Sequence, residues 1–353
     1  MSHKKFFIST ICVLLAVLLL FAATTVVIDS LFHYHKPLKC LEYPINNQRY
    51  QNDGILKNFD YDAIITGTSM TENFSATQFD ELFGTRSVKV PLEGSYLKES
   101  ADRLETAFEY NGNIRYVVRS LDIYSLCVDK DHISNYAYPD YLYDDNIFND
   151  VKYIFNKSIF VKNILGVLKY NKDKSKTPSF DEAYRWADKF NYGKQHVLER
   201  YTRIEKSEQV FENITDAKQT IKANIEQNVV RLALEHPDTE FYLFFPPYSI
   251  VTWDSWDRQG LLLYNVEIMR YVSELLVEYD NIHLFSFSDD FDTVCNLDNY
   301  KDLEHYGDWI NRDIFDNMKN NVGVINSENI DKHFDSLREF YSVYDYDSIF
   351  VAE

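Results

Sequence analysis

The sequence predicts an α/β protein: a three-layer domain with about five parallel strands and an inserted helical lid, preceded by one transmembrane helix. The main observation is that short apolar segments of strand length alternate with longer segments of helical periodicity. The connections between the short segments are long enough for the right-handed crossovers that parallel strands need. A third observation is an uncharged apolar run near the N-terminus. The 353-residue chain is 45% apolar and 26% charged, which is typical of a globular protein.

Residues 1 to 28 are expected to form a membrane anchor. The run from Phe6 to Ile28 carries no charge and corresponds to roughly 34 Å of helix, enough to cross a bilayer. Lys4 and Lys5 precede it, which favours a short cytoplasmic N-terminus and a main domain outside the cytoplasm. A cleaved signal peptide is the alternative, although its apolar region is normally shorter. Residues 29 to 58 then form a polar tether to the main domain, residues 59 to 353.

The first three predicted strands lie between Tyr61 and Asp122. Each is a short apolar segment that ends at a polar or turn-forming residue. They cover residues 63 to 66, 87 to 90 and 116 to 121. Helices are expected between them, because apolar residues recur every three or four positions over residues 72 to 83 and 97 to 108.

The periodic pattern loosens between about residues 129 and 215. This stretch is rich in Tyr, Asn, Asp and Lys and is too long for a plain loop, so we expect an inserted helical lid. Its best helix runs from Phe148 to Tyr170, with apolar residues around much of its circumference and several lysines. We expect this helix to pack on the main domain, and the alternative is that it lies on the membrane or against a membrane partner.

The last part of the chain returns to alternating strands and helices. A helix with Ile221, Ile225 and Val229 on one face ends before Pro237. The remaining strands are expected at residues 240 to 245 and 282 to 287, and the remaining helices at 261 to 279, from near 306, and at 328 to 342. Trp253, Trp256 and Trp309 either pack in the core or stack on sugar rings.

Polar residues follow each predicted strand at its carboxyl end. In a parallel sheet these ends share one edge, where α/β proteins bind ligands. The residues are Ser69, Gly94, Asp122, Tyr248, Asp302 and His305. They come from distant parts of the sequence, and we therefore expect one site at that edge.

Three of these residues match the parts of a serine nucleophile site. Ser69 is the candidate nucleophile, His305 the base that takes its proton, and Asp302 the carboxylate that orients His305. The backbone amides of Ser69 and Gly94 are candidates for the oxyanion hole, and the following helix is expected to point its amides at Ser69. The alternative is that Thr68, Ser69 and Thr71 merely cap that helix. Asp122 and Tyr248 have an undefined role at the same edge.

The segment Gly67-Thr68-Ser69, the later Gly94 and the terminal Asp302-x-x-His305 resemble an SGNH hydrolase. The resemblance covers residues 60 to 320 and implies a flavodoxin-like sheet. With the N-terminal anchor and Phe244 to Tyr248, the chain looks most like extracytoplasmic SGNH proteins of polysaccharide O-acetylation and the D protein of lipoteichoic acid D-alanylation. Two positions depart from the family pattern: Thr68 replaces an Asp, and Asp122 stands where an Asn usually donates to the oxyanion.

The resemblance implies an O-acyltransferase, with acetyl as the expected acyl group, that acts on a cell-surface polysaccharide with a membrane-bound O-acyltransferase partner. A carbohydrate esterase that uses the same three residues is one alternative, and a non-catalytic polysaccharide-binding scaffold is another. The net charge of −19 argues against a nucleic-acid partner. No cofactor and no metal are expected, and Cys40, Cys127 and Cys295 are too few for a disulfide framework.

Overall fold

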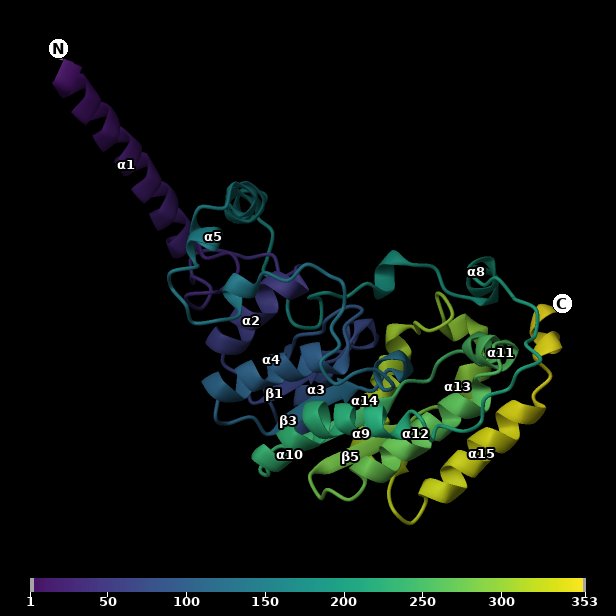
Figure 1. The fold of residues 1–353 in the computed structure, drawn as a ribbon. Helices are drawn as coiled ribbons and strands as arrows, with labels where there is room; N and C mark the ends of the chain where they lie inside the picture. Colours follow the sequence, from purple (N-terminus) through teal and green to yellow (C-terminus); the bar gives the residue numbers. More distant parts are fainter. Residues whose placement is uncertain (1–2, 352–353) are drawn as a thin grey trace. The chain divides into compact units, whose positions relative to one another are not determined.

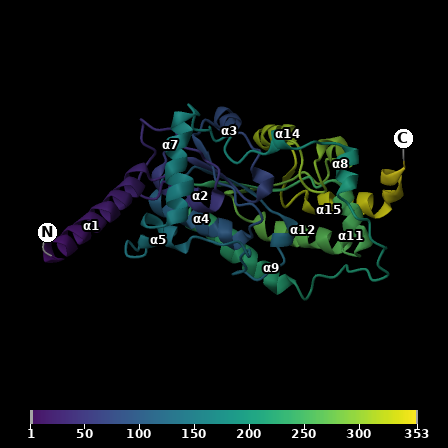
Figure 2. The same ribbon diagram turned by 90° about the horizontal axis from the view of Figure 1, so that it is seen from above.

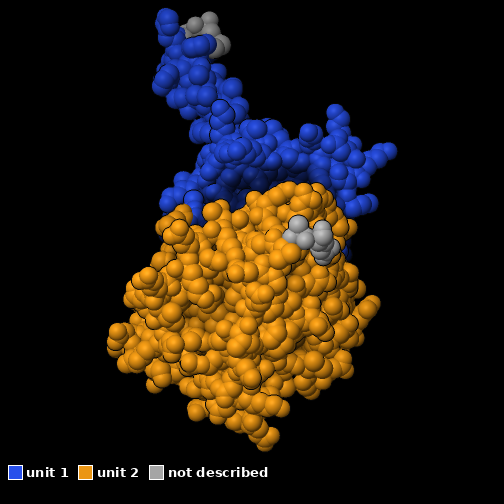
Figure 3. Space-filling view, turned by 90° about the vertical axis from the view of Figure 1, so that its right-hand side faces the viewer, with its two compact units in different colours: residues 1–60, 136–179 blue, residues 61–135, 180–353 orange. Residues whose placement is uncertain are grey.

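The computed structural model describes residues 3–351, which form two compact units (Figure 3). Unit 1 contains residues 1–60 and 136–179, and unit 2 contains residues 61–135 and 180–353. The predicted insertion at 129 to 215 is therefore divided, since its middle part belongs to unit 1 and its last part to unit 2. The sequence gives no sign of this division, because it depends on which distant segments share a core.

Unit 2 is built on a six-stranded, mostly parallel sheet (Figure 1). The strand order is β2-β1-β3-β4-β5-β6, and the first five strands are parallel. These five are β1 (Ala63–Thr66), β2 (Ser87–Lys89), β3 (Tyr116–Ser120), β4 (Glu240–Phe245) and β5 (Ile282–Ser286). The predicted set of parallel strands is confirmed. The antiparallel edge strand β6 (Val324–Ile325) has only two residues, too few to leave a pattern in the sequence.

Helices cover both faces of the sheet of unit 2, as expected for a three-layer α/β domain (Figure 2). On one face α3 (Ala76–Phe83) packs against α14 (Asp308–Lys319), and the Phe79 and Phe315 rings lie 5.1 Å apart. The other face carries α4 (Leu97–Tyr110), α12 (Leu262–Leu276), α15 (Ile330–Val343) and one long helix. That helix comprises α9 (Lys218–Ile225), the π-helical η6 (Glu226–Val230) and α10 (Arg231–Glu235).

The shorter helices of unit 2 lie in its loops. They are η1 (Ser69–Thr71), η2 (Ile123–Ser125), η5 (Ala187–Lys189), α8 (Lys194–Glu199), α11 (Ile250–Arg258), α13 (Phe291–Cys295), η7 (Leu297–Asn299) and η8 (Tyr346–Phe350). Trp253 of α11 is 1% exposed and stacks on Tyr341 at 3.5 Å, so this tryptophan packs in the core.

Unit 1 begins with α1 (His3–Ile28), which is long and apolar enough to cross a membrane by its length and composition. The predicted tether, residues 29 to 58, is ordered: it contains α2 (Gln48–Asn58) and the buried side chains of Leu31, Phe32 and Tyr43. Leu31 packs in one core cluster with Leu142, Tyr153 and Ile159 of the predicted insertion. The polar composition of residues 29 to 58 suggested an open linker. The segment is instead folded, because its few apolar side chains are buried against a distant part of the chain.

The expected helix from Phe148 to Tyr170 is broken into short pieces. The pieces are α5 (Val151–Ile154), α6 (Lys157–Ile159), the π-helical η4 (Phe160–Ile164) and α7 (Leu165–Lys172). The short helix η3 (Asp140–Leu142) precedes them. The break falls at Asn156, whose side-chain oxygen accepts from the backbone N–H groups of Ser158 and Ile159 and starts a new helix.

Candidate active site

Ser69 lies in the sharp turn that follows the buried strand β1. Gly67 permits this turn, because its φ is +130° and a Cβ there would come within 2.5 Å of Ser120 Oγ. The chain then forms the short 3₁₀ helix η1, and the Thr68 side chain accepts from the backbone N–H of Met70. Ser69 is half-buried at this point, with its hydroxyl directed to a partner from the far end of the chain.

The structure brings Ser69, His305 and Asp302 together. Ser69 Oγ lies 2.8 Å from His305 Nε2. His305 Nδ1 lies 2.9 and 3.0 Å from the two carboxylate oxygens of Asp302. With Asp302 ionised, Nδ1 carries the proton and Nε2 is left to accept from the serine hydroxyl. This is the arrangement that a serine nucleophile needs.

Asp302 is held in its ionised form. Burial alone raises its pKa, but the hydrogen bond and charge of His305 and the backbone N–H of Glu304 outweigh burial and lower that pKa to about 2. The carboxylate also accepts from the backbone N–H of His305 at 2.9 Å. Asp302 therefore fixes both the backbone and the ring of His305.

Asp122 lies just beyond the end of β3 and is 1% exposed. Thr68 Oγ1 and Ser120 Oγ donate to one carboxylate oxygen at 2.9 and 2.8 Å, and the Tyr248 hydroxyl donates to the other at 2.7 Å. The two smaller hydroxyls in turn accept from the backbone N–H groups of Met70 and Thr68. Asp122 and Tyr248 thus hold the turn on both sides of Ser69 rather than facing an open cleft.

The prediction that a helix begins at residue 72, directly after the Ser69 turn, is wrong in its starting point. The chain passes from η1 through Asn73 and Phe74, and α3 begins only at Ala76, where Ser75 Oγ accepts from the N–H of Gln78. The amide groups next to Ser69 therefore belong to a single 3₁₀ turn. Gly94 has a φ of +62° in the loop between β2 and α4, and its part in an oxyanion hole stays a prediction.

Several residues of the site gave no signal in the sequence. Trp186 packs edge-on against His305, with ring centroids 5.5 Å apart. Lys301 Nζ lies 3.7 Å from the centre of the Trp186 ring. The backbone N–H groups of Trp186 and Ala187 both donate to Asn73 Oδ1, which fastens the last part of the predicted lid to the loop after Ser69. No local periodicity marks these residues, because their positions depend on tertiary packing.

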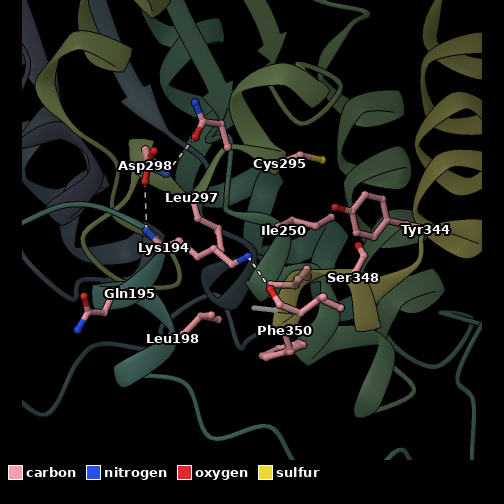
Figure 4. A pocket seen from close by; sticks show the side chains of 13 residues that line it. Lys194, Gln195, Leu198, Ile250, Cys295, Leu297, Asp298, Tyr344, Ser348 and Phe350 are labelled. Atoms are coloured by element: carbon pink, nitrogen blue, oxygen red, sulfur yellow. Dashed lines mark hydrogen bonds between the residues drawn. The ribbon is translucent and has the colours of Figure 1, made fainter. Parts of the chain in front are cut away.

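A pocket of about 780 Å³ lies elsewhere in unit 2 (Figure 4). It is bounded by Lys194 and Leu198 of α8, by Cys295 and Leu297, and by the segment around Phe350. Ser69, His305 and Asp302 do not line it. Hydrogen-bond geometry, rather than cavity size, therefore locates the candidate active site. Among residues 3–351 no group of three or more His, Cys, Asp or Glu side chains is arranged to hold a metal ion, and the four cysteines are free.

Comparisons with known proteins leave the family of this chain open. No protein-family model matches the sequence, and no curated protein matches it. A solved structure described as a platelet activating factor from Streptococcus pneumonia is 13% identical and covers 78% of this chain and 91% of its own. Its TM-score of 0.38 is too low to indicate a shared fold, so this likeness says nothing about the activity.

Proposed function

We propose that the protein is a serine acyltransferase of the SGNH type, which carries an acyl group on Ser69. The observation that carries the proposal is the chain of contacts from Ser69 Oγ through His305 to Asp302, at 2.8 and 2.9 Å. Its position beyond the ends of parallel strands β1 and β5 agrees with the ligand-binding edge of α/β sheets.

In the proposed reaction His305 Nε2 takes the proton of Ser69 as Oγ attacks the carbonyl carbon of an acyl donor. Asp302 stabilises the imidazolium that forms. The tetrahedral intermediate then loses its leaving group, which takes the proton from His305, and acyl-Ser69 remains. In the second half an acceptor hydroxyl gives its proton to His305 and attacks the acyl carbonyl, and Ser69 recovers the proton as it leaves.

The finer parts of the proposal come from the sequence resemblance. They are an acetyl donor, a polysaccharide hydroxyl as acceptor, a membrane-bound O-acyltransferase as partner, and a position outside the cytoplasm. A carbohydrate esterase uses the same three residues with water as acceptor. The scaffold alternative requires that Ser69 is never acylated.

The test uses the full chain in detergent, incubated with p-nitrophenyl acetate and analysed by peptide mass spectrometry. We expect one acetyl group on the peptide that contains Ser69, none in Ser69→Ala, and normal labelling in the exposed control Ser327→Ala. Labelling that persists in Ser69→Ala contradicts the assigned nucleophile, and a wild type that is never labelled supports the scaffold. Adding acetylated and free oligosaccharides separates transfer from hydrolysis, because only transfer produces an acetylated acceptor.

A further inference from the structure

Two neighbouring stretches of unit 1 expose apolar side chains at helical spacing. We call these seven side chains the apolar surface. They are Ile147, Phe148, Val151 and Phe155 in and around α5, and Val161, Leu165 and Leu168 in η4 and α7. Their exposed fractions range from 43% to 83%, which is unusual for so many large apolar groups in one short segment.

The same stretches already bury their other faces. Tyr153, Ile159, Ile164 and Val167 are between 0% and 5% exposed. The segment is therefore packed on unit 1 through one set of apolar residues and presents a second set outwards. The core of unit 1 does not need the apolar surface, so its exposure calls for a partner.

The apolar surface is continuous with the end of the apolar helix α1, and both views of the ribbon show α5 beside that end (Figures 1 and 2). The Phe21 ring stacks on Phe160 at 3.9 Å, and it lies 6.2 Å from the ring of Phe155. Thr25 Oγ1 donates to the backbone carbonyl of Ile154 at 3.3 Å. The Tyr153 hydroxyl donates to Asp29 at 2.9 Å and fixes the segment to the turn after α1.

The uncovered part of α1 indicates where a bilayer would end. Every side chain from His3 to Leu20 is exposed, and the first partly covered one is Phe21. The apolar part of that uncovered length, from Phe6 to Leu20, is roughly 22 Å of helix, which is shorter than the ~30 Å hydrocarbon core of a bilayer. The hydrocarbon region should therefore continue past Leu20 and include the level of Phe21, where Phe155 and Phe160 pack.

The charge of this segment is opposite to that of the whole protein. Residues 147–168 contain three lysines and one aspartate, and residues 169–176 add four lysines and one aspartate, although the chain has a net charge of −19. Lys152, Lys157, Lys162 and Lys169 are exposed beside the apolar surface. Apolar side chains edged by lysines are typical of segments that lie in the interface of an anionic membrane.

We propose that residues 147–168 lie in the membrane interface, on the side from which unit 1 emerges. The apolar surface enters the acyl-chain boundary and the lysines contact anionic headgroups. The lipid surface, rather than another protein, is the partner that the position of Phe21 and the excess of lysines favour. This goes beyond the proposed acyl transfer and depends on α1 crossing the bilayer.

The test uses the full chain in vesicles of phosphatidylcholine and phosphatidylglycerol, with single cysteines labelled with the fluorophore NBD. Phe148→Cys and Leu165→Cys report on the apolar surface in a background where all four native cysteines are alanine. A variant that keeps only Cys12 of α1 is the membrane control, and Val343→Cys, at a side chain that is 78% exposed in unit 2, is the control outside this surface. Lipids with a nitroxide on the acyl chain quench labels in the membrane, and acrylamide quenches labels in water.

We expect labels at positions 148, 165 and 12 to be quenched by nitroxide lipid and protected from acrylamide, with the reverse at 343. Quenching at 148 and 165 should weaken in pure phosphatidylcholine, because the lysines then lose their anionic partners. Labels at 148 and 165 that acrylamide reaches as easily as the label at 343 overturn the proposal. Protection from both quenchers also overturns it, since it indicates a protein contact between copies of the chain.

Discussion

Asp122 is the residue at which this site departs most from the pattern it resembles. It sits where an amide donor is expected, yet its carboxylate accepts from the hydroxyls of Thr68, Ser120 and Tyr248. Through Thr68 and Ser120 it holds the backbone amides that flank Ser69. The geometry favours a positioning role for Asp122, in which it sets the shape of the nucleophile turn.

We therefore expect Asp122→Asn to slow acylation of Ser69 at every pH, by an amount on the order of 10²-fold. An Asn side chain replaces one accepting oxygen with an NH₂ group, so at least one of the three hydroxyls loses its acceptor and the turn shifts. The measurement is the rate of Ser69 acylation against pH. Tyr248→Phe, which removes one donor but leaves the Thr68 contact, should lose less activity.

Two other results would contradict this role of Asp122. A variant faster than wild type across the pH range would mean that the negative charge limits oxyanion stabilisation. A nearly neutral Asp122→Asn, together with wild-type activity that falls as pH rises, would mean that a protonated Asp122 donates a hydrogen bond.

The raised pKa of Asp122 also predicts that the stability of the protein depends on pH. Burial raises its pKa, and the hydrogen bonds from Tyr248, Ser120 and Thr68 offset burial only in part. The folded protein thus keeps this proton to a higher pH than the unfolded chain, whose Asp pKa is about 4. The stabilisation from Asp122 is complete below that value and is lost as pH rises through the folded pKa.

The free energy of unfolding of the wild type minus that of Asp122→Asn should therefore decrease as pH rises above about 4 and then level off. Chemical denaturation of both proteins at a series of pH values measures it. The lowered pKa of Asp302 makes stability change with pH in the opposite direction. This contribution is the same in both proteins, so it cancels in the difference between them. A difference that increases with pH contradicts the expected shift.

At the scale of elements, a buried lysine holds the loop between η1 and α3. Lys89 of β2 is fully buried, and its amine donates to the backbone carbonyls of Glu72, Phe74 and Asp181 at 2.6, 2.9 and 3.1 Å. Burial lowers its pKa to about 7, but all three donors of the ammonium form have partners. Lys89 thus joins the strand, the loop after Ser69 and the segment that carries Trp186.

We expect Lys89→Met to destabilise the protein by about 3 kcal/mol or more, because two buried carbonyls and a partly buried third one lose their donor. Ser69 acylation should slow as well, since the loop that follows η1 loses its support. The measurements are chemical denaturation and the acylation rate. Lys332→Met, at an exposed position of α15, is the matched control and should leave both unchanged. Equal stability of wild type and Lys89→Met would show that the carbonyls find other donors.

At the scale of the whole molecule, α1 is the feature from which we predict where the protein works. It is the one described helix that is long and apolar enough to cross a membrane. In unit 1 its last turns pack against Phe160 and Ile154, so the helix continues directly into a folded unit. We predict that α1 is kept as an anchor and is not removed as a signal peptide.

The protein should therefore stay with membranes after a high-salt wash, and its mature form should retain the peptide that contains Phe6. Changing Leu14 and Leu18 to lysine should release it or block its insertion, because each charge at the helix centre costs roughly 3 kcal/mol. A soluble wild-type form that begins near residues 24 to 30 would identify α1 as a cleaved signal.

The sequence by itself determined the parallel strands of the sheet and indicated which polar residues to expect together at its edge. All five parallel strands followed from short apolar segments, because burial on both faces leaves a local mark in the amino-acid pattern. Ser69, Asp302 and His305 could be selected because polar residues at strand ends must share one edge of a parallel sheet. Their roles in catalysis remain a proposal.

Only the tertiary structure decided the contacts that no local pattern encodes. Residues 29 to 58 look polar and open, yet Leu31 is buried with Tyr153 from the predicted lid. Asp122 faces the hydroxyls of Thr68, Ser120 and Tyr248 rather than an open cleft, and these partners come from three segments that are distant in the sequence. Periodicity reports which face of an element is buried, whereas the partner of that face depends on how distant segments fill the same volume.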